Sequence, residues 1–365
     1  MAQFPLPPGS TLGILGGGQL GRMLALAAAR LGFDVAVLER DADSPAGRVA
    51  AHTIVGPYTD DAALRALAAV ASVVTYEFEN VPAASVLALK ALGVDVAPGP
   101  EALAVAQDRV AEKQFLNANG APTVAFSAAS TPEEALAATL AMGAPVLMKT
   151  RREGYDGKGQ RWVEHPADAA RIFAELGGVP VILEAPADFV RELSIIAARG
   201  RDGATAIYPL AENHHENGVL RRSVAPATVT PALADQAERI AMRVLQGLDY
   251  VGVVGIELFE LRDGQLLVNE IAPRVHNTGH WTQDGCEVDQ FEQHIRAVVG
   301  WPLGPTEPHA RVEMLNLLGD EVDAWAKLAQ EPETRIHLYG KRDAKPGRKM
   351  GHVNRVKSLS DDFLP

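Results

Sequence analysis

The segment TLGILGGGQLGRMLALAAARLGFDVAVLER, residues 11–40, reads as strand, glycine turn, helix and strand, and it constrains the fold most. Gly16, Gly18 and Gly21 fit the spacing G-x-G-x-x-G. Glu39 ends the next apolar run, where dinucleotide-binding folds carry a ribose-binding acid. The helix that follows presents its N-terminus to an anion. The segment predicts the start of a parallel α/β sheet and leaves open whether the ligand is a dinucleotide or another phosphate.

The alternation of strands and helices continues to residue 107. Strand-like runs at residues 12–15, 35–38, 73–76 and 94–97 are separated by helical stretches rich in alanine and leucine, which predicts a helix-covered parallel sheet. Residues 121–187 read as a smaller unit around a glycine loop, and strands dominate residues 191–299 apart from one helix. We expect Thr230 to cap that helix, Pro231 to begin it and Gly247 to stop it.

Composition excludes several classes of protein. The 365 residues are 47% hydrophobic with a net charge of −12, which suits two or three globular domains and disfavours nucleic acid or a membrane as partner. No apolar run is long enough to span a membrane, and MAQFPLPPGS lacks the features of a signal peptide. Cys286 is the only cysteine, so no intramolecular disulfide can form and a cytoplasmic location is expected.

A β-hairpin is predicted within VGVVGIELFELRDGQLLVNEIAPRVHN, residues 251–277. Two apolar runs flank Asp263-Gly264, a dipeptide typical of two-residue hairpin turns. If these two residues form the turn, Arg262 faces Gln265, and each step away from the turn pairs the next residues of the two strands.

Counting back from that turn places Glu257 opposite Glu270 and Leu258 opposite Asn269. Directly paired residues share a face of the hairpin, with Cβ atoms roughly 5 Å apart. Two facing carboxylates repel each other unless one is protonated or a cation lies between them, and oxygen-only ligands suit Mg²⁺. The alternative is a pair of exposed glutamates on an edge hairpin. The apolar neighbours of both residues favour the metal site.

The segment KTRREGYDGKGQ, residues 149–160, combines glycines with lysines. Gly154, Gly157 and Gly159 would let backbone N–H groups approach a phosphate, and Lys149 and Lys158 would add charge. The Walker A spacing is absent. A plain surface hairpin is the alternative, and the segment alone does not separate the two readings.

Arg274, His276 and His280 follow the predicted hairpin in APRVHNTGHW, with Cys286 nearby. A zinc site is disfavoured because a second cysteine and the spacing of a zinc finger are missing. Arg274 beside a metal carboxylate reads as an anion clamp, whereas the histidines could also be core or capping residues. The basic run YGKRDAKPGRKMGH, residues 339–352, fits either a phosphate-binding loop or a solvated tail.

Taken together, these segments resemble the ATP-grasp superfamily and, within it, the N5-carboxyaminoimidazole ribonucleotide synthetases of purine biosynthesis. The resemblance covers nearly the whole chain in family order, through GILGGGQLGRM, YEFENVP, QDR, GYDGKGQ, RELS, YPLAENHHENGVLRRSVAPA, LLVNEIAPRVHNTGHWT and PGRKMGHV. It implies an α/β fold, α+β overall. Its parts are a Rossmann-like (pre-ATP-grasp) domain at residues 1–107, an ATP-grasp domain at 108–300 with a lid at about 121–187, and a small C-terminal domain at 301–365.

The resemblance also implies the reaction. An ATP-dependent carbon–nitrogen ligase of this family carboxylates the exocyclic amine of 5-aminoimidazole ribonucleotide with bicarbonate, through carboxyphosphate and CO₂, and releases ADP and phosphate. Mg²⁺ is the implied metal, with Mn²⁺ as an alternative. ATP, bicarbonate and the ribonucleotide are the implied small-molecule partners, and the implied assembly is a homodimer.

Site residues follow from the resemblance, position by position. The residues implied for ATP are Arg109, Lys149, Gly154, Tyr155, Asp156, Gly157, Lys158, Gly159, Gln160, Glu184, Ala185, Pro186, Ala187, Glu192, His215, Asn269 and Glu270. Those implied for the ribonucleotide are Gln19, Leu20, Glu77, Lys341, Arg348 and Lys349. Those implied for the carboxyl transfer are Arg274, His276, Tyr155 and Asp156, with Glu257 and Glu270 on the metal. One departure is Glu153, which stands where the family commonly has glycine.

Three other readings remain. A formate-dependent glycinamide ribonucleotide transformylase shares the grasp core and the ribonucleotide phosphate site, although NEIAPRVHNTGHWT and GYDGKGQ favour the carboxylating enzyme. An NAD-dependent oxidoreductase would explain the opening fingerprint but leaves the glutamate hairpin and the basic run unexplained. A nucleotide-binding regulator without catalysis is the third, and only turnover separates it from an enzyme.

Overall fold

The computed structural model describes residues 2–154 and 158–361, so the predicted site residues Tyr155, Asp156 and Gly157 lie outside the described residues. The N-terminal part is a five-stranded parallel sheet in the order β3-β2-β1-β4-β5. Its strands are β1 (Thr11–Leu15), β2 (Asp34–Glu39), β3 (His52–Val55), β4 (Val73–Tyr76) and β5 (Asp95–Val96). Its helices are α1 (Gln19–Arg30), α2 (Asp61–Val70), α3 (Ala83–Ala91) and α4 (Pro100–Ala106).

The parallel sheet confirms the predicted alternation, with one strand missed. The four predicted runs correspond to β1, β2, β4 and β5, although β5 is only two residues long. The strand β3 at the edge of the sheet was not predicted. Its residues are largely exposed, so the sequence there lacks the apolar run that marks the buried strands.

A nine-stranded sheet forms the centre of the molecule, in the order β15-β14-β10-β12-β13-β16-β18-β17, with β11 paired to β10. Its strands are β10 (Phe189–Arg199), β11 (Thr205–Ile207), β12 (Ala211–Glu216), β13 (Val219–Ala225), β14 (Gly252–Leu261), β15 (Leu266–Ala272), β16 (Arg311–Leu318), β17 (Thr334–Leu338) and β18 (Lys349–Lys357). Because β13 pairs with β16, the C-terminal strands extend the same sheet.

The helices around this sheet are α8 (Pro231–Gly247), α9 (Thr282–Gly285), α10 (Gln290–Val299) and α11 (Trp325–Leu328), with 3₁₀ turns at Asn277–Gly279 and Gly319–Ala324. The helix α8 begins as predicted: Thr230 accepts a hydrogen bond from the backbone N–H of Leu233 at 3.3 Å, and Pro231 is its first residue. Gly247 is its last residue, which confirms the predicted stop. Within the described part of the chain, no helix has the length and apolar character needed to cross a membrane.

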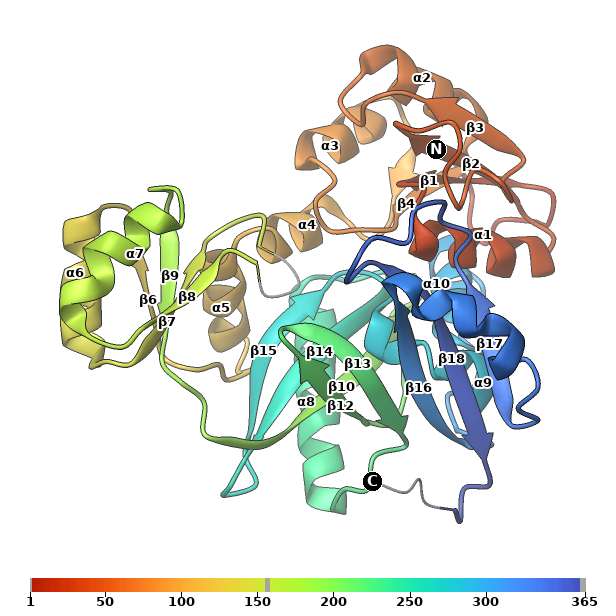
Figure 1. Cartoon of the computed structure of the whole chain (residues 1–365). Helices are drawn as coiled ribbons and strands as arrows, with labels where there is room; N and C mark the ends of the chain where they lie inside the picture. Colours follow the sequence, from red (N-terminus) through yellow and green to blue (C-terminus); the bar gives the residue numbers. More distant parts are fainter. Residues whose placement is uncertain (1, 155–157, 362–365) are drawn as a thin grey trace.

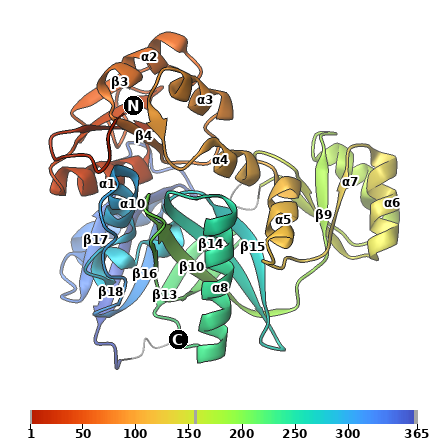
Figure 2. The ribbon, with the colours of Figure 1, turned by 180° about the vertical axis from the view of Figure 1, so that it is seen from behind.

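The third unit is a four-stranded sheet, β6-β9-β7-β8, covered by two helices. It consists of β6 (Phe126–Ala129), α6 (Pro132–Met142), β7 (Val146–Thr150), β8 (Gln160–Val163), a 3₁₀ turn at Pro166–Asp168, α7 (Ala169–Glu175) and β9 (Val181–Glu184). This unit projects from the body of the molecule, and helix α5 (Arg109–Ala118) lies between it and strand β15 (Figures 1 and 2).

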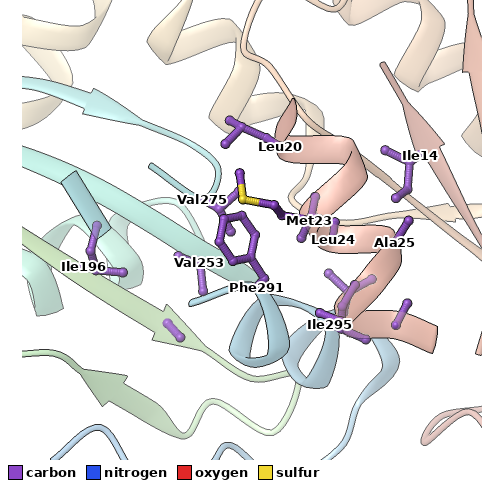
Figure 3. Close-up of a cluster of buried hydrophobic side chains, with 14 of the residues drawn as sticks. Ile14, Leu20, Met23, Leu24, Ala25, Ile196, Val253, Val275, Phe291 and Ile295 are labelled. Carbon is purple, nitrogen blue, oxygen red and sulfur yellow. The ribbon is translucent and has the colours of Figure 1, made fainter. Parts of the chain in front are cut away.

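The N-terminal part is fastened to the central sheet by a continuous apolar core. Leu20, Met23 and Leu24 of α1 face Phe291 of α10, and all four side chains are buried (Figure 3). Close packing of this kind stabilises roughly in proportion to the apolar area removed from water. The N-terminal part and the central sheet are therefore held in a fixed arrangement by this shared core.

Candidate active site

One cleft of about 340 Å³ opens where the three units meet, a size typical of small-ligand sites. It gathers predicted residues from segments far apart in the sequence. The predicted residues that line it are Arg109, Lys149, Gly154, Lys158, Gln160, Glu192, His215, Glu257, Asn269, Glu270, Arg274, His276 and Lys349. Most of the implied ATP and transfer residues therefore share one cavity.

The carboxylate pair is present, but the register around it differs from the prediction. Glu257 lies directly opposite Glu270, as predicted, whereas Leu258 pairs with Val268 instead of Asn269. The structure differs from the predicted hairpin by one residue in the turn and by one residue in the strand, and the two differences compensate each other. The turn has three residues, since the backbone N–H of Leu261 bonds the carbonyl of Gln265, and Asn269 is the extra residue of a β-bulge.

The electrostatics of this pair suit a cation. Burial, and then the charge of Glu270, raises the pKa of Glu257 to about 7, so two ionised carboxylates here are costly without a positive partner. Arg109 Nη1 lies 3.3 Å from Glu270 Oε2, and His276 Nε2 lies 3.7 Å from Glu257 Oε1. Among residues 2–154 and 158–361, no group of three or more acidic, histidine or cysteine side chains has the arrangement of a complete metal site. The pair therefore fits a metal that takes further oxygen ligands from its substrate, as Mg²⁺ does.

Lys149 points toward the cleft from β7 and is held by a buried carboxylate. Glu184, at the end of β9, lies 2.7 Å from Lys149 Nζ and 3.3 Å from Lys113 Nζ. Burial opposes ionisation of Glu184, but the two lysines lower its pKa below the usual value. The Glu184 carboxylate therefore forms ion pairs with Lys149 and Lys113 and holds both in place. Ala185, Pro186 and Ala187, which the resemblance also assigns to ATP, do not line the cleft.

The glycine loop is anchored to helix α5 through Arg109, whose Nη2 donates to the carbonyl of Gly154 at 2.9 Å. Gly159 has φ of +73°, and an added Cβ there would lie 2.7 Å from Thr150 Oγ1, so a larger residue would not fit without movement. Glu153 has φ of 65°, in the left-handed region. This explains physically why a glycine suits that position, since a residue with Cβ is strained there.

Glu192 and His215 reach the cleft from the neighbouring strands β10 and β12. His215 Nδ1 lies 2.7 Å from Glu192 Oε2. Burial lowers the pKa of His215, but the hydrogen bond to Glu192 and the charge of Glu257 outweigh it, so the net shift is upward. The imidazole is therefore hydrogen-bonded to the Glu192 carboxylate, and both side chains line the cleft.

Arg274 and His276 follow β15 along the cleft wall. Arg274 Nε bonds Glu79 Oε2, and Nη1 donates to the carbonyl of Val275 at 3.0 Å. Although burial opposes it, Arg274 lowers the pKa of Glu79 to about 2, so this ion pair persists at neutral pH. Burial and Arg274 lower the pKa of His276 well below its usual value. These surroundings therefore favour the neutral form of His276.

The glycine turn before α1 departs from the expected phosphate site. Glu77 accepts hydrogen bonds from the backbone N–H groups of Gly18 and Gly21, the latter at 2.7 Å, and Glu39 accepts one from Gly17 at 2.7 Å. Burial raises the pKa of Glu77, and the two backbone bonds oppose that rise. The anion at this helix terminus is the chain's own carboxylate, so the expected ligand phosphate is not accommodated there as the turn stands.

The other residues predicted for the ribonucleotide are dispersed. Gln19 begins α1 outside the cleft lining, and the side chain of Leu20 is buried in the core, which leaves only its backbone for a ligand. Lys349 lines the cleft, whereas Lys341 and Arg348 do not. Lys341 Nζ donates to the carbonyl of Lys349 at 2.7 Å, and Arg348 Nη1 to that of Asp343 at 3.1 Å.

Several residues of the site were not predicted. Glu79 and Asn80 line the cleft two and three residues after Glu77, in the same YEFEN segment. Glu112 and Lys113 of α5 are buried, and burial with the charge of Glu270 raises the pKa of Glu112 to about 8. A glutamate and a lysine in an amphipathic helix can be recognised as site residues only once the buried face of the helix is known.

Comparisons with protein families cover nearly the whole chain. A ribonucleotide synthetase preATP-grasp domain matches residues 10–107, an ATP-grasp domain matches 114–291, and a phosphoribosylaminoimidazole carboxylase C-terminal domain matches 313–363. The N5-carboxyaminoimidazole ribonucleotide synthase of Brucella melitensis is 50% identical over 98% of this chain and 99% of its own length. That of Bacillus subtilis is 41% identical over 100% of this chain and 96% of its own length.

Solved structures agree with these relatives. An ADP complex of an N5-carboxyaminoimidazole ribonucleotide synthetase has a TM-score of 0.93 and 39% identity, covering 96% of this chain and 93% of that chain. The Aspergillus clavatus synthase, in complex with ADP and 5-aminoimidazole ribonucleotide, has a TM-score of 0.88 and 33% identity, covering 96% and 94%. The α/β fold with an ATP-grasp core is thereby confirmed. The chain belongs to the N5-carboxyaminoimidazole ribonucleotide synthase family of ATP-grasp ligases.

Proposed function

We propose that this chain uses ATP and bicarbonate to carboxylate the exocyclic amine of 5-aminoimidazole ribonucleotide, releasing N5-carboxyaminoimidazole ribonucleotide, ADP and phosphate. The observation that carries the proposal is the shared cleft, in which a carboxylate pair, Lys149 and Arg274 face one cavity. Its support from relatives is the family membership and the solved structures of family members with ADP and with the ribonucleotide.

The first step is phosphoryl transfer. A bicarbonate oxygen attacks the γ-phosphorus of ATP, the bond to ADP breaks, and carboxyphosphate forms. Arg109 and Lys149, both on the cleft wall, offset the charge of the triphosphate. Mg²⁺ held by Glu257 and Glu270, or Mn²⁺ in its place, would neutralise further charge on the β- and γ-phosphates. Glu192, oriented by His215, would receive the ribose hydroxyls.

The second step is carboxyl transfer. Carboxyphosphate releases CO₂ and phosphate, and the exocyclic nitrogen of the ribonucleotide attacks the carbon of CO₂. Arg274, fixed by Glu79, orients bicarbonate before this step. The proton lost by the amine passes to His276, which is neutral before the transfer, or to Asp156, which lies outside the described residues.

The ribonucleotide would lie between the N-terminal part and the C-terminal strands, with its phosphate near Lys349. Contacts by Gln19, Glu77, Lys341 and Arg348 remain part of the proposal, and each would need the side chain to exchange its present partner or to shift toward the cleft. We also propose domain limits at 107 and 300, a homodimer and a cytoplasmic location. The buried free thiol of Cys286 agrees with the last of these.

The test is ADP release measured with ATP, bicarbonate and 5-aminoimidazole ribonucleotide, omitting each in turn. Full turnover should need all three, and N5-carboxyaminoimidazole ribonucleotide should form in step with ADP. Replacing bicarbonate by formate, and the ribonucleotide by glycinamide ribonucleotide, should abolish turnover. Activity with formate would instead identify a transformylase, and no turnover with either set would identify a non-catalytic nucleotide-binding protein.

A further inference from the structure

Strand β15, which carries Asn269 and Glu270, lies at the edge of the central sheet. An edge strand has one row of backbone groups without partners in the sheet. Here those groups are bonded to helix α5 and the segment that follows it. The N–H of Val268 donates to the carbonyl of Pro122 at 2.7 Å, and the N–H of Ile271 donates to Glu112 Oε1, also at 2.7 Å.

The spacing of these two N–H groups matters. In a regular strand, groups that point to the same edge are two residues apart. Val268 and Ile271 are three residues apart, which is the spacing that one extra residue at Asn269 produces. The Glu112 carboxylate therefore bonds the bulged form of the strand. Lys113 adds a second contact, since its Nζ donates to the carbonyl of Asn269 at 3.3 Å.

The bulge decides which residue faces Glu257. Leu258 pairs with Val268, so a regular ladder would continue by pairing Glu257 with Asn269. A slip of one residue turns each side chain to the other face of a strand. With the three-residue turn kept and no bulge, Glu270 would leave the face it shares with Glu257, and the carboxylate pair would not form.

The burial of the two α5 residues shows that they are not ordinary surface charges. Glu112 is 3% exposed and Lys113 is 1% exposed. Burying such groups is costly unless their polar atoms have partners. Glu112 accepts from the N–H of Ile271, next to the bulge. Lys113 Nζ contacts the carbonyl of the bulge residue Asn269 and lies 3.3 Å from Glu184 Oε1. Helix α5 lies along β15 in both views of the molecule (Figures 1 and 2).

We propose that Glu112 and Lys113 are positioning residues that select the bulged register of β15 and so bring Glu270 opposite Glu257 for metal binding. The inference rests on the metal site of the proposed function. Neither residue needs to touch the metal or the nucleotide. Their effect is on metal affinity, through the backbone of residues 269–271.

The test measures Mn²⁺ affinity of the full chain with ADP present, from the electron paramagnetic resonance signal of free Mn²⁺. Glu112→Met removes the acceptor at nearly constant volume and should weaken Mn²⁺ binding at least tenfold. Glu112→Gln keeps an acceptor oxygen and should stay within about threefold of wild type. Tyr208→Phe, which removes a buried hydrogen bond of 2.8 Å to the carbonyl of Val288, controls for a general loss of stability.

Unchanged Mn²⁺ affinity in Glu112→Met would overturn the inference, as would equal weakening in Tyr208→Phe or in Glu112→Gln. If Glu112→Met does not fold, Lys113→Met gives the second measurement, with at least fivefold weakening expected and no weakening overturning the role of Lys113. Failure of wild-type protein to bind Mn²⁺ with ADP would instead contradict the metal site itself. The two failures are therefore distinguishable.

Discussion

The Glu77 carboxylate is bonded to the backbone N–H of Gly21 at 2.7 Å, at the helix terminus where a dinucleotide fold would bind pyrophosphate. An added Cβ at Gly18 would lie 2.6 Å from Glu77 Oε1. Gly18 therefore leaves the space that the Glu77 carboxylate occupies at this turn. The predicted local fold is present, the turn holds the chain's own carboxylate, and contact of this turn with the ribonucleotide stays a prediction.

Glu77→Gln should destabilise the N-terminal part. Glutamine presents one acceptor oxygen and one N–H₂ group, so one of the two glycine N–H groups loses its acceptor and faces another donor. An unsatisfied buried N–H costs about 1–3 kcal/mol. Urea unfolding should show that loss, whereas the exposed Glu101→Gln should leave the midpoint within error. Equal midpoints for wild type and Glu77→Gln would mean that the carboxylate does not hold the turn.

NAD⁺ should leave the melting temperature unchanged, because the carboxylates of Glu77 and Glu39 already occupy the N–H groups that a pyrophosphate would need. ADP with Mg²⁺ should raise it, since a ligand at a hundred times its Kd stabilises by about 2.7 kcal/mol. Differential scanning fluorimetry checks both. A rise in melting temperature with NAD⁺ alone would instead support an NAD-dependent oxidoreductase.

Glu270→Ala should abolish ATP turnover, with a fall of at least about a hundredfold, while the fold remains. The side chain is 41% exposed and repels Glu257, so its removal costs little stability. ADP release with Mg²⁺ measures turnover, and the melting temperature checks folding. Glu212→Ala, a half-exposed glutamate paired with Arg191, is the control and should keep activity. Near-normal ADP release from Glu270→Ala would contradict its assignment to the metal.

Gly255→Ala should impair carboxylation more than nucleotide binding. An added Cβ at position 255 would lie 2.5 Å from the Cβ of His276. The backbone of His276 cannot move freely, because the Gln290 side chain bonds both its N–H, at 2.9 Å, and its carbonyl, at 2.8 Å. Displacing a reacting group by about 1 Å can cost on the order of a hundredfold in rate.

Formation of N5-carboxyaminoimidazole ribonucleotide should therefore fall by about ten- to a hundredfold in Gly255→Ala, while the Kd for ADP changes less than threefold. Gly200→Ala is the matched control, because the one close contact of its added Cβ is the end of the Asp202 side chain, at 2.7 Å, and the Ala204 carbonyl lies at an ordinary 3.8 Å. A wild-type rate of carboxylation in Gly255→Ala would mean that the position of His276 does not matter for carboxyl transfer.

The hairpin illustrates how far sequence reasoning reaches. The pairing of Glu257 with Glu270 was predicted because the turn dipeptide and the apolar runs are local signals. The prediction is right although the loop has one more residue than expected, since the bulge at Asn269 restores the register. That bulge depends on Glu112, which bonds Ile271 across 159 positions of sequence. A contact of that kind has no local signature.

The same limit applies to Arg274 and Glu79. The motif around Arg274 predicted an anion clamp, but its carboxylate partner lies 195 positions earlier, in the N-terminal part. Packing of the N-terminal part against the central sheet, through α1 and α10 and through His294 with Thr75, brings the two together. The chemistry of single segments could thus be predicted, whereas the partners that orient each group follow from the assembly of the units.

His294 should make the protein lose stability as the pH falls below about 6.5. This buried histidine of α10 joins the two larger sheets. Its Nδ1 accepts from the backbone N–H of Val253 at 3.1 Å, and its Nε2 lies 2.8 Å from Thr75 Oγ1. Burial lowers its pKa to about 3, so the folded state holds it neutral. Above pH 6.5 both folded and unfolded states are neutral, and stability does not depend on this group.

Between pH 6.5 and about 3 only the unfolded state binds the proton at His294, so stability falls by up to about 1.4 kcal/mol per pH unit. Other buried groups also titrate in this range. Comparing wild type with His294→Gln separates the contribution of His294 from theirs. His294→Gln keeps an acceptor and a donor without a titratable ring. Its free energy of unfolding, from urea titrations between pH 4 and 7, should fall less steeply than that of wild type. Equal slopes would mean that His294 is protonated in the folded protein, and that the bond from Val253 is not made to a neutral ring.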